Sequence, residues 1–142
     1  MYVADGKRLT AAGARKVLDT ALARAREAGI PVTVAVVDAG GHLVVLERME
    51  GGKFHTVHSA TTKAVCAASN KRNTGSKGSV GQALDVGHAL GLALAAGPER
   101  WTAMEGGWPI MAGGECIGAV GVAGGNWEFD ERVAKEAAES LS

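Results

Sequence analysis

The chain has 142 residues, of which 46% are hydrophobic and 21% are charged, with 15 basic and 15 acidic side chains. This length and balance predict a single soluble domain over residues 1–142, large enough to bury a core. The absence of net charge argues against a protein that binds nucleic acid or an anionic membrane.

The expected location of the protein is the cytoplasm. The first residues lack the apolar segment of a secretory signal. No apolar run approaches the roughly 20 residues that span a bilayer, which argues against a membrane protein. The two cysteines, Cys66 and Cys116, fit neither a disulfide framework nor a zinc motif, and we expect them to be inert, buried thiols.

The first predicted element is a helix that begins after Thr10. Its apolar residues recur at helical spacing and share one face: Ala14, Val17, Leu18, Ala21, Leu22 and Ala25. Thr10 is suited to cap the start of this helix, and Gly29 followed by Pro31 is a stop signal.

Two β-hairpins are predicted from one shared pattern, in which a glycine pair separates two apolar runs. In the first hairpin, Gly40 and Gly41 lie between the runs Val32–Val37 and His42–Leu46. In the second, Gly113 and Gly114 supply the positive φ angles that a tight turn needs.

Helices are expected on both sides of these strands, because the strands are apolar on both faces. The expected helices lie near Phe54–Ser69, near Val80–Ala95 and from about Asp130 to Leu141, in addition to the first one. The hairpins make the sheet largely antiparallel. The sequence therefore predicts a three-layer α/β/α sandwich of the α+β class.

Glycines recur at every third residue near the end of the second hairpin, at Gly118, Gly121 and Gly124. This spacing matches neither a strand face nor a phosphate-binding loop, and the chain contains no GxGxxG or GxxxxGK[ST] motif. Glycine inside a strand marks close approach by another backbone or by a ligand, and both alternatives stay open. A nucleotide site is not expected.

Several motifs together resemble one known family. They are VDAGGHL at Val37–Leu43, ERMEG at Glu47–Gly51, KA at Lys63–Ala64, GGWPI at Gly106–Ile110, IGAVGVAG at Ile117–Gly124 and DE at Asp130–Glu131. Their order over nearly the whole chain is similar to the GlcG/HbpS family, which also supplies the C-terminal domain of PduO-type proteins. The resemblance implies a profilin-like fold with a five-stranded antiparallel sheet and assembly into homo-oligomers. Some members bind haem and others belong to catabolic operons, so fold resemblance leaves the activity open.

Histidines are the first candidates for ligand or acid–base chemistry. His55 and His58 lie three residues apart on a predicted helix, so their side chains share a face. One such imidazole beside an apolar slot can hold haem iron, whereas zinc needs further ligands, so no metal beyond haem iron is expected. The alternative is that both are exposed polar residues at a helix start. We expect His42 to cap a strand face and His88 to lie in the core or an interface.

Three charged residues are the candidates for catalysis if the protein is an enzyme. Lys63 matches the lysine of the family motif, and in a pocket it would offer a cation or an amine whose pKa is lowered by burial. Arg48 is a second candidate for anion binding. Asp130 is a candidate general base, although a first-turn acid that stabilises the helix dipole is the simpler interpretation.

Three functions remain open, and a small-ligand-binding protein is favoured. Its ligand would be haem or another planar compound with carboxylates, covered by Trp101, Trp108 or Trp127 and resting on the glycine-rich strand. The residues predicted to contact this ligand are His55, His58, Trp108 and Gly121. The second function is a cofactor-free isomerase-, tautomerase- or lyase-like enzyme that moves protons on a small carbonyl or carboxylate compound. The third is a structural or protective oligomer that serves a partner enzyme.

Overall fold

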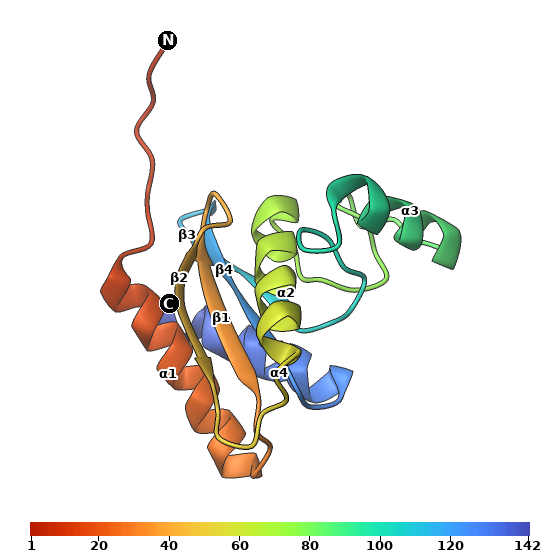
Figure 1. Ribbon diagram of the computed structural model, residues 1–142. Helices are drawn as coiled ribbons and strands as arrows, with labels where there is room; N and C mark the ends of the chain where they lie inside the picture. Colours follow the sequence, from red (N-terminus) through yellow and green to blue (C-terminus); the bar gives the residue numbers. More distant parts are fainter.

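A four-stranded antiparallel sheet forms the centre of the fold in the computed structural model, which describes residues 1–142 (Figure 1). The strands are β1 (Thr33–Asp38), β2 (Leu43–Arg48), β3 (Gly107–Ala112) and β4 (Glu115–Ala123), in the order β2-β1-β4-β3. Both predicted hairpins are confirmed, and β1 pairs with β4 to join them. The expected fifth strand does not form, because the segments that flank the hairpins are helix or loop.

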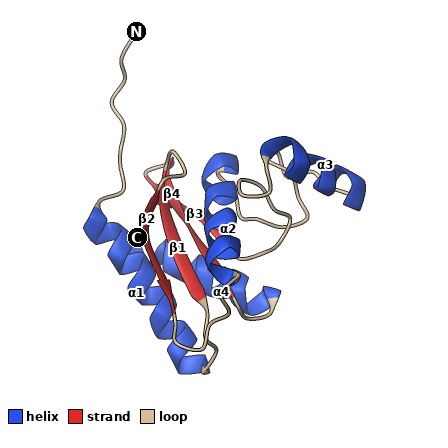
Figure 2. Ribbon diagram, viewed as in Figure 1, coloured by secondary structure: helices blue, strands red, loops and turns tan.

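Helices cover both faces of the sheet, which confirms the predicted sandwich (Figure 2). On one face lie α1 (Ala11–Ala28) and α4 (Trp127–Ala138), the latter followed by the short 3-10 helix η1 (Glu139–Leu141). On the other face lies α2 (Thr56–Asn70), and α3 (Val86–Ala96) projects beyond it. No helix has the length and apolar character that crossing a membrane would require.

Side-chain caps set where the helices begin. The Thr10 hydroxyl accepts the backbone N–H of Gly13, and Gly29 ends α1 in the left-handed region at φ 69°, as predicted. All six apolar residues predicted for the inner face of α1 are buried. Asp85 and Asn126 cap α3 and α4 in the same way, so α3 begins later, and α4 earlier, than the apolar pattern alone suggested.

The two apolar layers of the sandwich differ in thickness. Large side chains, including Leu22, Ile110 and Phe129, fill the layer beneath α1 and α4. The layer between the sheet and α2 is built from small residues: Ala35, Val37, Ala60, Ala64, Ala67, Ala68, Ala119 and Ala123. Small side chains let α2 lie close against β4.

The close approach of α2 explains one of the recurring glycines. A Cβ at Gly121 would collide with the backbone oxygen of Ala60 and the backbone nitrogen of Ala64. Of the two alternatives left open for this glycine, the structure supports packing against another backbone. Gly121 therefore contacts α2 and leaves no room for a ligand.

We expect Gly121→Ala to lower the free energy of unfolding by about 1–3 kcal/mol, because the added methyl group must displace the backbone of α2. Urea denaturation measures the change. The control is Gly91→Ala in α3, where a Cβ meets no heavy atom within 4 Å, so no loss of stability is expected. Equal denaturation midpoints for Gly121→Ala and the wild type would contradict the packing interpretation.

Candidate functional site

A pocket of about 750 Å³ lies among the first turns of α2, one side of α3, the loop that precedes β3 and the turn between β4 and α4. Its volume falls in the range of small-molecule sites, roughly 300–1,000 Å³. The lining residues that bear on function are His55, His58, Thr62, Lys63, Trp101 and Asp130. The fold thus brings together residues from four separate segments.

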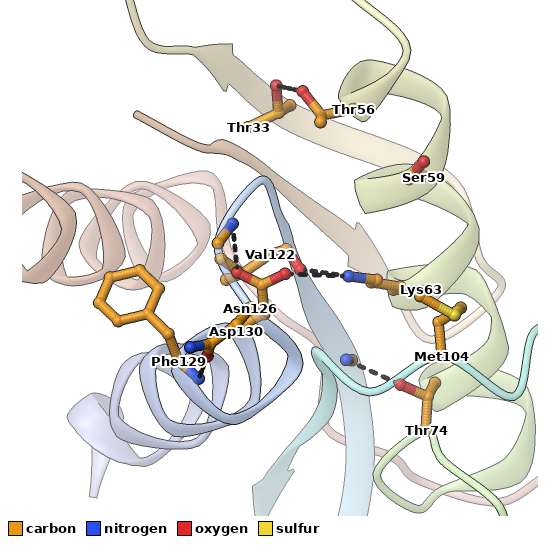
Figure 3. Close-up of polar contacts among 12 residues, drawn as sticks. Thr33, Thr56, Ser59, Lys63, Thr74, Met104, Val122, Asn126, Phe129 and Asp130 are labelled. Carbon is orange, nitrogen blue, oxygen red and sulfur yellow. Dashed lines mark hydrogen bonds and ion pairs between the residues drawn. The ribbon is translucent and has the colours of Figure 1, made fainter. Parts of the chain in front are cut away.

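A buried ion pair forms part of the pocket wall (Figure 3). Lys63 extends from α2 past the end of β4, where its Nζ donates to the backbone oxygen of Val122 at 2.9 Å. The same Nζ lies 3.3 Å from Oδ2 of Asp130, and the two side chains are only 6% and 4% exposed. The other carboxylate oxygen of Asp130 accepts the N–H of Gly125 at 2.9 Å. The pair therefore connects α2, β4 and α4.

Burial shifts the two members of this pair towards their uncharged forms. Loss of hydration lowers the pKa of Lys63, and the negative charges of Asp130 and Glu105 oppose the shift without cancelling it. Loss of hydration likewise raises the pKa of Asp130, against the opposing effects of Lys63 and of backbone hydrogen bonds. Burial thus acts against the charged form of each group, while their mutual attraction and hydrogen bonds act in its favour.

Thr62 brings an unused polar group to the pocket. Its hydroxyl is buried and has no hydrogen-bond partner within the chain. A buried polar group in this state costs about 1–3 kcal/mol, and native proteins contain few of them. Thr62 lines the pocket, but its oxygen is covered by protein atoms, so the hydroxyl is an unpaired group within the pocket wall.

The histidine pair also lies at the pocket. His55 is the N-cap residue of α2, yet its side chain makes no capping hydrogen bond, and His58 follows in the first turn. Both residues line the pocket and both are exposed. The chain contains no group of three or more His, Cys, Asp or Glu side chains arranged to hold a metal ion.

Arg48, Trp108 and Gly121 do not line the pocket. Arg48 donates from Nη1 to the backbone oxygen of Gly52. Trp108 packs against the core beneath α1 and α4, with the Lys135 ammonium 5.6 Å from its ring centre. Alternation along β3 explains this placement, because successive side chains of a strand point to opposite faces.

The remaining candidates are divided between the pocket and the surface. Of the tryptophans, Trp101 lines the pocket, whereas Trp127 is exposed and does not. His42 and His88 are exposed and pair with nearby aspartates, so the expectation of a core position for His88 is wrong. The reason is that α3 projects from the body of the protein.

Sequence reasoning missed the wall that α3 contributes, which includes Val86 and Leu90, and Met104 in the loop before β3. Contact with a ligand was left open for Gly124, which does line the pocket together with Gly125. The available signal for Gly125 was its place beside Gly124, directly before the Asn126 cap. Cys66 is buried, and this raises the pKa of its thiol, as expected for an inert cysteine.

The antiparallel α/β/α sandwich with a pocket at the start of α2 defines a small-ligand-binding protein of the α+β class. The chain belongs to the family described as haem degrading protein HbpS-like, whose model matches residues 9–139. This confirms the resemblance that the sequence motifs indicated.

Relatives and solved structures are similar over nearly the whole chain. A relative from Citrobacter freundii, an uncharacterized 15.0 kDa protein in the dhaT-dhaS intergenic region, is 33% identical over 94% of this chain and 92% of its own. The crystal structure of Klebsiella pneumoniae protein ORFY has 27% identity and a TM-score of 0.85, covering 100% of this chain and 99% of that one. A crystal structure of a PduOC:heme complex has 29% identity and a TM-score of 0.81, covering 93% and 94%.

We expect Lys63→Met to lower the free energy of unfolding by about 3–5 kcal/mol, because it leaves the Asp130 carboxyl buried without its partner. The matched control is Glu136→Gln, which breaks the 2.8 Å surface pair with Arg24 and should cost less than about 1 kcal/mol. Chemical denaturation of both variants checks this difference. Similar losses in the two variants would show that the buried pair has no special structural weight.

Proposed function

We propose that this protein binds haem, or another planar compound that carries carboxylates, in the pocket between α2 and α3. The observation that carries the proposal is the joint position of His55 and His58 on the wall of that pocket. His55 or His58 would hold the iron of a bound haem through a neutral imidazole. The haem complex of a protein with the same fold supports this assignment.

The lining of the pocket fits such a ligand. Val86, Leu90 and Ala93 of α3 form an apolar wall for a ring system, and Trp101 adds an aromatic surface. The Lys53 ammonium on the same pocket is available to pair with a carboxylate.

A cofactor-free enzyme is the second candidate function, because the buried Lys63–Asp130 pair also lines the pocket. A lysine and an aspartate in hydrogen-bond contact are suited to proton transfer on a small carbonyl or carboxylate compound. This function needs no haem, so haem binding separates the two candidates.

We also infer that the protein assembles into homo-oligomers through α3. None of the residues of this helix is buried, and Val86, Leu90 and Leu94 are 84%, 59% and 72% exposed. Monomeric proteins seldom expose a continuous apolar patch of this kind. A second copy of the chain would cover it and complete the outer side of the pocket.

The cytoplasm is the proposed location. Both cysteines are free, with Cys66 buried and Cys116 half-buried. Free thiols without a disulfide are typical of proteins in reducing compartments.

We expect haemin at neutral pH to give a sharpened Soret band with the wild-type protein. The double substitution His55→Ala/His58→Ala should abolish the sharpening of the Soret band, because it removes both imidazoles of the pocket. Absorption titration measures the band and the affinity.

The control for this titration is the double substitution His42→Ala/His88→Ala, which removes the two histidines outside the pocket. It should keep the full band. A full band in His55→Ala/His58→Ala would reject those ligands, and no band with the wild type would favour the enzyme.

Sedimentation at micromolar concentration should show a species well above the 14.4 kDa chain. Leu94→Lys should yield monomers, because a charge on the exposed side of α3 opposes burial between copies. Leu43→Lys, at an exposed leucine of β2, is the control and should leave the assembly unchanged. A monomeric wild-type protein would contradict the inference.

A further inference from the structure

The side chain of Lys63 has properties that ligand binding alone does not use. Its Nζ has three N–H donors when protonated, and the folded chain supplies two acceptors, the backbone oxygen of Val122 and the carboxylate of Asp130. Lys63 and Asp130 both line the pocket, beside the side chain of Met104 (Figure 3). The Lys63 Nζ therefore has a proton acceptor, the Asp130 carboxylate, 3.3 Å away.

The surroundings of this amine favour its nucleophilic form. The charged groups that act on it are Asp130 from α4 and Glu105 from the loop before β3, while the exposed His55, His58 and Lys53 lie on the same pocket. Burial outweighs the carboxylates and lowers the pKa of Lys63. The exposed lysines elsewhere on the chain lack this desolvation, and free lysine side chains titrate near roughly 10.4.

We propose that Lys63 captures small aliphatic aldehydes in the pocket by forming an imine. The aldehyde class follows from access: the Lys63 side chain is 6% exposed, so only an unhindered carbonyl carbon can reach its nitrogen. The proposal uses the pocket of the proposed ligand-binding function but requires no haem.

Protons move between Lys63, Asp130 and the aldehyde during this reaction. Lys63 first transfers one proton to Asp130, the neutral amine attacks the carbonyl carbon, and Asp130 returns that proton to the carbonyl oxygen, which gives an N-protonated carbinolamine. A nitrogen proton then passes to Asp130, which donates it to the hydroxyl group as the C–O bond breaks, so that water leaves and a protonated imine remains beside the Asp130 carboxylate. The net reaction converts one amine and one aldehyde into one imine and one water, without an oxidant or reductant.

The experiment traps the imine on the full-length protein. The protein is incubated at pH 7 with propanal and cyanoborohydride, which reduces an imine to a stable propyl amine, and peptide mass spectrometry locates the propyl groups. Lys63 should be labelled faster than Lys53, because burial lowers its pKa and so raises its fraction of neutral amine. The α-amino group serves as the internal reference.

Three further measurements distinguish the pocket reaction from labelling of unfolded chains. Asp130→Asn should slow labelling of Lys63, because the loss of the proton acceptor outweighs the loss of the charge that raises the pKa of Lys63, and it should leave labelling of Lys53 unchanged. Ala93→Trp fills the pocket from α3. It should slow the labelling of Lys63 and leave the labelling of the α-amino group unchanged. Raising the pH should reduce the advantage of Lys63, because a lowered pKa then adds less to its fraction of neutral amine.

Labelling of Lys63 no faster than that of Lys53 would overturn the proposal. The wild-type peptide map decides this point even if a variant fails to fold. The haemin titration is a separate readout, so loss of haem binding with retained Lys63 labelling would refute only the haem assignment. Haem binding without Lys63 labelling would refute only the imine.

Discussion

The contact between the backbone of α2 and that of β4 is the constraint on which the rest of the structure depends. Gly121 removes the side chain that would hold the two elements apart, and the surrounding layer is built almost entirely from alanine. The opposite layer is filled with larger side chains and does not require such a close backbone contact. Because α2 lies so close, the side chain of Lys63 can reach the carbonyl oxygen at the end of β4.

The buried pair extends this constraint from packing to chemistry. Lys63 reaches Asp130 only because β4 ends beside the first turn of α4, where Asn126 begins the helix. A charged pair placed there is satisfied by backbone groups on both sides. Lys63 and Asp130 also line the pocket, so the ion pair both closes the end of the sandwich and forms part of the site. Lys63 and Asp130 thus stabilise the fold and also line the site.

Local signals accounted for most of the fold. The glycine turns of both hairpins, the Thr10 cap and the Gly29 stop act within a few residues, so the sequence displays them directly. The start of α3 was displaced because the Asp85 cap outweighs the apolar residues that precede it. The site was harder to predict from the sequence. Lys63 and Asp130 were each recognised as candidates, but their contact joins residues 67 positions apart. Trp108 was assigned to the ligand although the alternation of β3 directs it to the other face.

The position of α3 has a consequence for how the pocket opens. This helix forms one wall of the pocket, yet it buries none of its own residues against the body of the protein. Hydrogen exchange in such an element reflects local opening, which needs far less free energy than global unfolding. Ordering of α3 and occupancy of the pocket are then thermodynamically linked, and each stabilises the other.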